Sequence, residues 1–519
     1  MHSIVTIAMA GTSRQEQVTF ASGTPVDELA AALPSSEEVE RSFLLSAGAL
    51  AIYRQAGEQA QTVEAQEPAQ QETLRECSPE AALLISRLCN NEHAPLLVEA
   101  LERIRQQGLR LPFRLLPQVL NLTGKEVKAA LAPVLGERAR WLSHLNNSWK
   151  WVNNYLVTQE DSLPADAERI WQEGTPGQRL EILRRQRSVD PALARTWLED
   201  AWKQEKAEMR GEMVAALSIG LSADDEPFLE KALDDRAASV QTAVADLLAL
   251  LPTSALSERQ RQRAQELLRM VDGQLEIHVP AKLERAWQRD GINDRHPSHI
   301  SKRSWFMLQL LGQVDPTFWE SYLGAPPAEL LKRFAINEEW KVQVIEGWTR
   351  AALKFHTPNW LEPLWSWWQT SYQEIEPKHT LLENDYQDQL LGKMAAPLAE
   401  RLILKTIPSD SGELLADCQS FLSALPRPWS VEFARFYLRS MRGRCAAERL
   451  QQADFNPYKD LFFQEMPSYA YALPAACFAE ALQEMDVPQG TSWQLQYVRG
   501  QVRSFTDIVR VRQQINEEI

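Results

Sequence analysis

The segment best suited to binding a metal is the run Asp-Arg-His-Pro-Ser-His at residues 294–299. Two neutral imidazoles and a carboxylate are good zinc ligands, but a site needs three or four ligands that converge in space. His296, His299 and Asp294 lie in an expected loop where they could converge, yet no further ligand is evident nearby. We therefore expect a polar loop before a helix, with Asp294 in a surface charge network that includes Lys302, and no metal or cofactor.

Nucleophilic catalysis has little support in the sequence, which contains no G-x-S-x-G and no H-E-x-x-H. Cys89 and His93 are four residues apart, but the intervening Asn-Asn-Glu does not supply the positive charge that stabilises a thiolate. The five cysteines are odd in number, widely spaced and without a C-x-x-C pair. They are expected to be small core residues in a reducing compartment, and no catalytic residue is predicted.

Two kinds of residue could instead form protein-interaction surfaces. Asp224 and Asp225 belong to a short acidic run, which fits helix caps and solvated turns or an acidic ridge that meets a basic partner. On a helix, Trp365 and Trp368 share a face while Trp367 points away, so at least one is expected at a surface. Tryptophan is enriched at interface hot spots, but packing between neighbouring helical pairs is the favoured explanation of the cluster. The interaction candidates are Trp365, Trp367, Trp368, Trp149, Trp151, Asp224 and Asp225.

The overall charge disfavours nucleic acid as a partner. The 519 residues include 70 acidic side chains and 55 Lys plus Arg, a formal net charge of −15, whereas phosphate binding rests on a concentrated positive field. The basic groups at residues 184–187 and 435–444 have helical spacing and are expected to be solvated faces. The longest uncharged stretch, residues 466–479, holds two prolines and is too short to span a membrane. The N-terminus lacks the Lys or Arg of a signal peptide, so a cytoplasmic location is expected.

Composition and periodicity divide the chain into five parts. A helical segment over residues 1–56 precedes a Gln/Glu/Ala-rich flexible linker at 57–77, where large apolar residues are scarce. Helices are expected over 78–160, a repeat region over 161–278, and a Trp-rich helical lobe over 279–519, which holds most of the 17 tryptophans. No convincing alternating strand pattern is present apart from a short one at 3–7. The predicted class is all-α.

The repeat region shows its period in its apolar stripes. Within residues 236–251, six apolar residues fall at i, i+3, i+4, i+7, i+8 and i+11, the spacing of an amphipathic helix. Thirty residues earlier, Met213 and Leu217 repeat this apolar spacing. Companion helices are expected between the apolar helices, and Asp190-Pro191 supplies the N-cap and the first-turn proline of one of them. Two helices per unit at a period of about 30 to 40 residues indicate an α-solenoid, in one lobe or two.

Residues 233–247 resemble the second helix of a HEAT repeat. In that family an Asp starts the turn, and Val, Ala and Leu pack inward, which Asp235, Val240, Ala243 and Leu247 match. Gln241 stands where the family usually has Arg.

A longer resemblance covers most of the chain, carried by residues 171–174, 179–183, 190–195 and 225–236. These are similar to an uncharacterised bacterial family whose members are encoded beside a MoxR-type AAA+ ATPase, a von Willebrand factor A-domain protein and a SWIM zinc-finger protein. The resemblance implies those proteins as partners, but it supplies no activity and no site residues.

These observations favour a non-enzymatic α-solenoid scaffold or adaptor for protein–protein interaction. The alternative is a HEAT-like nucleic-acid-binding protein or DNA-base excision enzyme, which would need a clustered Lys/Arg face with an Asp or Trp at its centre. A third hypothesis is a solenoid that only assembles with itself.

Overall fold

The computed structural model of the chain describes most of its 519 residues, in two compact units. The described residues are 8–9, 22–32, 39–57, 67–90, 94–152, 163–164, 166–271, 274–280, 282–335, 339–371, 386–406, 421–452 and 454–519. The units are Met1–Pro68 and Ala69–Ile519. None of the described helices combines the length and the apolar character needed to cross a membrane.

The first unit contains two described helices that pack on each other, α2 (Val26–Ala31) and α3 (Val39–Gly57). Val26 on α2 and Leu50 on α3 are both buried. Helix α3 ends within one residue of the end of the helical segment expected over residues 1–56. The strand pattern at 3–7 and residues 58–66 of the expected linker lie outside the described residues.

The second unit begins earlier than the linker prediction implied. The Glu72 carboxylate accepts hydrogen bonds from the backbone N–H groups of Glu137 (2.9 Å) and Arg138 (3.0 Å), and so caps a helix far along the chain. Gly136 has a φ of 77°, and a Cβ there would collide with that carboxylate. Residues 69–77 are therefore part of the folded unit.

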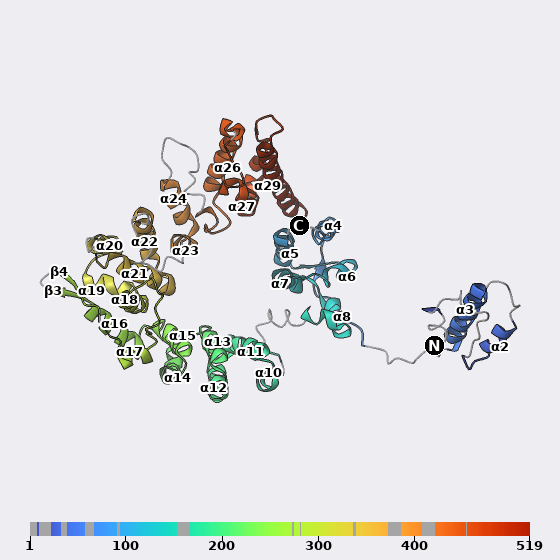
Figure 1. Cartoon of the computed structure of the whole chain (residues 1–519), viewed down its shortest axis with the longest axis horizontal. Coiled ribbons are helices and arrows are strands. Elements are labelled where there is room, and N and C mark those ends of the chain that lie inside the picture. Colours follow the sequence, from blue (N-terminus) through green and yellow to red (C-terminus); the bar gives the residue numbers. More distant parts are fainter. Residues whose placement is uncertain are drawn as a thin grey trace. The chain divides into compact units, whose positions relative to one another are not determined.

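The regular structure of the second unit is almost entirely helical, so the protein is all-α (Figure 1). The α-helices are α4 (Pro79–Leu88), α5 (Ala94–Gln106), α6 (Leu116–Val119), α7 (Lys125–Leu131), α8 (Glu137–Leu145), α10 (Ala167–Glu173), α11 (Pro176–Val189), α12 (Pro191–Ala201), α13 (Ala207–Ala216), α14 (Glu226–Ala232), α15 (Ala238–Ala249), α16 (Ala255–Leu267), α17 (Arg285–Arg289), α18 (Lys302–Gly312), α19 (Thr317–Leu323), α20 (Pro327–Ala335), α21 (Lys341–Phe355), α22 (Pro358–Ser371), α23 (Tyr386–Lys393), α24 (Ala396–Thr406), α26 (Val431–Ala446), α27 (Leu461–Tyr469), α28 (Phe478–Ala481) and α29 (Trp493–Glu518).

Two minimal sheets accompany these helices. One is the parallel pair β1 (Arg75–Glu76) and β2 (Leu109–Arg110), and the other is the antiparallel hairpin β3 (Leu268–Val271) and β4 (Gln274–Ile277). The hairpin pairs Leu268 with Ile277. Its strands are so short that their alternation of apolar and polar residues cannot be distinguished in the sequence from the end of a helix.

Local sequence explains where the helices of the repeat region begin and which face they bury. Helix α11 opens with a capping box formed by Thr175 and Gln178, and α12 opens with the Asp190 carboxylate accepting from the Leu193 N–H at 3.0 Å. On α15, the predicted stripe is buried apart from Ala243, which is half-buried. Met213 and Leu217 are also buried, and α13 packs against α15 as their common register predicts.

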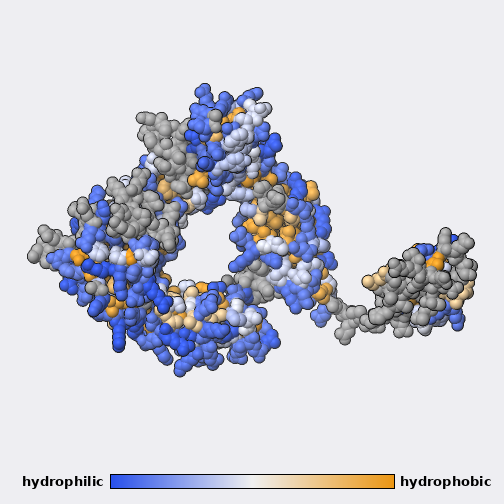
Figure 2. Space-filling view, viewed as in Figure 1, coloured by the Kyte–Doolittle hydropathy of each residue, from blue (hydrophilic) through white to orange (hydrophobic). Residues whose placement is uncertain are grey.

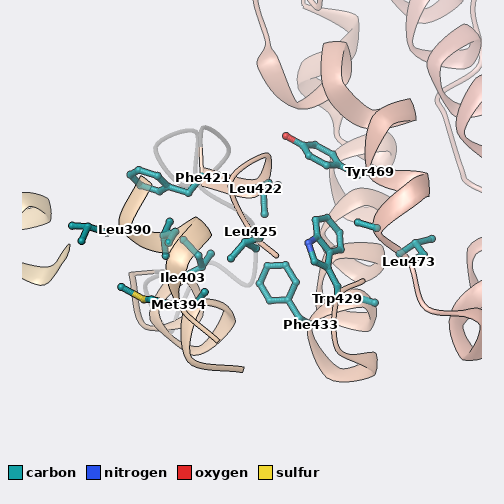
Figure 3. Packing of buried hydrophobic residues seen from close by; sticks show 14 of the residues in the cluster. Leu390, Met394, Ile403, Phe421, Leu422, Leu425, Trp429, Phe433, Tyr469 and Leu473 are labelled. Carbon is teal, nitrogen blue, oxygen red and sulfur yellow. The ribbon is translucent and has the colours of Figure 1, made fainter. Parts of the chain in front are cut away.

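Two hydrophobic cores hold the second unit together. The smaller lies within residues 167–256, the repeat region. The larger joins residues 77–152 to residues 264–515, so two parts that appear separate in the sequence share one core. In one part of this core, Trp429 just before α26 and Phe433 on α26 lie beside Leu425, with Ile403 of α24 on the other side of Leu425 (Figure 3).

The last helix joins the end of the chain to the beginning of the second unit. Helix α29 packs against α4 and α5 as well as against α27 (Figure 1). The Arg512 guanidinium donates to both carboxylate oxygens of Glu99 on α5, at 3.0 and 2.8 Å, and to the backbone carbonyls of Ala470 and Leu473. One side chain thus connects three distant segments.

Arginine–carboxylate pairs connect successive helices of the repeat region. Arg187 on α11 and Asp225 before α14 are both fully buried and form two parallel hydrogen bonds of 3.0 Å. Arg210 on α13 lies 2.8 Å from Asp235. Gln241, which stands where HEAT repeats usually have an arginine, donates to the carbonyl of Leu233. The basic group at 184–187 was expected to be solvated, and for Arg187 that expectation is wrong.

Substitution of Asp225 tests the buried pair, with its exposed neighbour Asp224 as the matched control. Asp225→Ala would leave Arg187 buried and unpaired, so we expect the free energy of unfolding to fall by about 3–5 kcal/mol. Asp224→Ala should change it by less than about 0.5 kcal/mol. Urea unfolding followed by circular dichroism measures both, and equal effects would contradict the assignment.

The same pair predicts a pH dependence. Burial alone would raise the pKa of Asp225, but hydrogen bonds from Arg187, Arg195 and the Ser222 N–H outweigh burial and hold this pKa below its ordinary value of 3.8. The stabilisation is therefore complete at neutral pH and is lost as the pH falls through the lowered pKa. The difference between wild type and Asp225→Ala should shrink over that acidic range.

Candidate functional site

The His/Asp loop does not gather its side chains into a metal site. Asp294 pairs with Lys302 at 3.4 Å, as the charge-network hypothesis expected, and His296 contacts the carbonyl of Pro297. Asp294, His296 and His299 are all exposed. Across the ranges that the structure describes, no group of three or more His, Cys, Asp or Glu side chains could hold a metal ion.

The cysteines described by the structure have raised thiol pKa values, the opposite of what a nucleophile needs. Burial raises the pKa of Cys89 to about 11 and that of Cys445 to about 12. Burial also raises the pKa of Cys77 and of Cys477. His93 and Cys418 lie outside the described residues.

The tryptophan trio divides between the core and the surface. Trp365 and Trp368 are buried, 3% and 1% exposed, and the Trp368 indole donates to the Thr349 hydroxyl at 2.9 Å. Trp367 is half-buried and packs edge-on against Trp368 at 5.1 Å between ring centroids. Of the three, only Trp367 is partly exposed.

The remaining interaction candidates are also divided. Trp149 and Trp151 are half-buried and donate to the Asn121 side chain (3.0 Å) and the Leu120 carbonyl (3.2 Å), which ties them to the core. Asp224 is exposed, whereas Asp225 is enclosed by its arginine partners. The acidic run therefore supplies one surface carboxylate and one structural one.

A groove is formed by residues 199–236, within the expected repeat region. It has a volume of about 590 Å³, within the range of ligand-binding clefts, and lies between the C-terminal end of α12, α13, α14 and the turn that follows α14. Trp202 and Phe228 line it edge to face, with ring centroids 5.2 Å apart. Arg210 lies over the Trp202 ring at 5.6 Å and is held there by Asp235.

The groove rim is rich in charge. Its charged lining residues are Glu199, Lys203, Arg210, Lys231, Asp234, Asp235 and Arg236. A second pocket of about 350 Å³ near the hairpin is lined by Arg263, Arg269, Arg303 and Trp287, together with the carboxylates Glu266 and Glu284. Figure 2 shows mainly hydrophilic side chains on the viewed face of the second unit, with hydrophobic ones gathered over α5 and α7.

An exposed aromatic cluster lies at the start of α29. Tyr458 and Trp493 stack with centroids 5.6 Å apart, and Tyr497 lies 4.2 Å from Tyr458. Tyr458 and Trp493 are 59% and 49% exposed.

Sequence reasoning missed both the groove and this cluster. Trp202 and Phe228 come together only through the packing of the helices around them, which the sequence does not reveal. The pair Trp202-Lys203, an aromatic residue followed by a cation at a helix end, was the one available signal.

Fold and groove place the chain among all-α proteins built from many short packed helices. The chain belongs to the family of unknown function DUF5691, which it matches over residues 3–519. No curated protein and no solved structure matches it.

The raised thiol pKa values predict slow alkylation in the native protein. At pH 8 a thiol with a pKa near 11 is about a hundredfold less ionised than an ordinary cysteine. Iodoacetamide should therefore label Cys89 and Cys445 much more slowly before unfolding in guanidinium than after it. Peptide mass spectrometry measures both rates. Equal labelling rates at Cys89 before and after unfolding would contradict a buried thiol with a raised pKa.

Proposed function

We propose that this protein is a non-enzymatic scaffold or adaptor, an α-solenoid of HEAT-like helical pairs that binds other proteins in the cytoplasm. The groove between α12 and α14 carries the proposal, since an aromatic floor with a charged rim is typical of peptide recognition. The order of packing supports the solenoid, because α11 packs on α12 and on α13, and α13 packs on α15.

The ion pairs between helical pairs also favour a scaffold. Arg187 reaches forward to Asp225 and Arg210 to Asp235, and further along Arg259 reaches forward to Asp290 at 2.9 Å. In each case an arginine of one helix contacts a carboxylate 25 to 38 residues ahead. Such ion pairs favour a stack of helices whose binding surface is already formed before a partner binds.

The resemblance to a family encoded beside particular neighbours suggests the partners. We infer a MoxR-type AAA+ ATPase and a von Willebrand factor A-domain protein, with the SWIM zinc-finger protein as a third. A scaffold in such a system would present a client to the ATPase or regulate it.

The alternative is a HEAT-like nucleic-acid-binding protein or DNA-base excision enzyme, favoured by the second pocket with its three arginines and Trp287. Two of those arginines are engaged, because Arg263 pairs with Asp290 at 2.7 Å and Arg303 donates to the carbonyl of Val279. The net charge of −15 also opposes it. A salt-sensitive mobility shift with duplex DNA would favour this alternative over the scaffold.

Gentle purification of the tagged full chain from its native cells, with and without ATP, tests the scaffold directly. Mass spectrometry should find the AAA+ ATPase or the A-domain protein at near-stoichiometric amounts, and the recovery of the ATPase should depend on the nucleotide. A tagged, unrelated protein of similar net charge controls for non-specific capture. Recovery of the chain alone, or only as a concentration-dependent oligomer of itself, would contradict the proposal.

A further inference from the structure

The charges around the groove are unequally compensated. Arg210 is neutralised by Asp235 at 2.8 Å, and Asp234 is neutralised by Arg289 at 2.7 Å. Among the described residues, Lys203, Lys231 and Arg236 have no ion-pair partner, and Glu199 is the single rim carboxylate without one.

The groove therefore presents a net excess of free positive charge on a chain whose formal net charge is −15. Lys203 and Lys231 are exposed and lie on different helical segments, one just after α12 and one on α14. Both lysines line the same groove as Trp202 and Phe228, so a segment bound there would be within reach of two cations and two aromatic rings.

We infer that this groove binds a segment of a partner protein in which a large apolar side chain is flanked by carboxylates. The apolar side chain would rest on Trp202 and Phe228, and the carboxylates would pair with Lys203 and Lys231. Nucleic acid fits less well, because the net charge of −15 opposes a long run of closely spaced phosphates more than it opposes a short segment with a few carboxylates. This inference rests on the proposed scaffold function and names the chemistry of its partner.

The test uses the full chain and a short fluorescein-labelled peptide with a central tryptophan and two glutamates on either side. Fluorescence anisotropy should show saturable binding that weakens as ionic strength rises. A peptide with glutamine in place of glutamate, and one with serine in place of tryptophan, should each bind at least about tenfold more weakly. Equal binding by the glutamine peptide would overturn the charge assignment.

The double variant Lys203→Glu/Lys231→Glu should lose about tenfold or more in affinity for the glutamate peptide. Lys125→Glu/Lys332→Glu changes the net charge by the same amount on exposed helix positions elsewhere and should bind like wild type. Both variants remove exposed lysines, so their thermal unfolding should match wild type. Equal weakening by the two double variants would overturn the inference, because it would show only a response to total charge.

The outcomes separate this inference from the proposed function. Peptide binding that depends on the two groove lysines supports the groove even if no AAA+ ATPase is recovered from cells. Recovery of the ATPase in equal amounts with wild type and Lys203→Glu/Lys231→Glu, without peptide binding, would reject the peptide chemistry assigned to the groove but not the interaction with the ATPase.

Discussion

The buried pair of Arg187 and Asp225 is the interaction on which the repeat region depends. A buried charge is costly unless every polar atom finds a partner, and here the guanidinium is fully satisfied. Besides Asp225 it donates to four backbone carbonyls, each at 2.9 or 3.0 Å, while Arg195 adds a second cation to the carboxylate at 2.8 Å. Those carbonyls belong to Pro191, Leu217, Ile219 and Gly220. One side chain of α11 thus holds the start of α12 and the turn between α13 and α14.

In the rest of the second unit, the fold is stabilised mainly by hydrophobic packing between segments that are far apart in the sequence. The larger core unites residues 77–152 with residues 264–515, and Arg512 joins the last helix to Glu99 on α5. The proposed binding groove, however, lies within the smaller core and its ion pairs. Its floor residue Phe228 packs in that core, and Arg210 is oriented toward Trp202 by Asp235. The arginine–carboxylate pairs between these helices therefore also shape the surface proposed to bind a partner.

The sequence predicts helices well where burial follows one face, as at Val240 and Leu247, because periodicity records which side is apolar. It also predicts the Asp190 cap, a purely local interaction. It cannot predict that Arg187 meets Asp225, since the two lie 38 residues apart and a cation near other cations resembles a solvated face. The tryptophan trio shows the same limit. Helical spacing correctly separates Trp367 from Trp365 and Trp368, but which side faces the core is decided by neighbouring helices.

Hydrogen exchange measured by mass spectrometry on the full chain tests the central claim, that a preformed stack held by buried ion pairs supports the groove. In wild type, amides across α11 to α15 should exchange slowly as one cooperative unit. In Asp225→Ala, exchange should accelerate in α11, α12 and α14 together while α29 is unchanged. Acceleration confined to residues 222–226, or fast exchange across the repeat region of the wild type, would contradict the account.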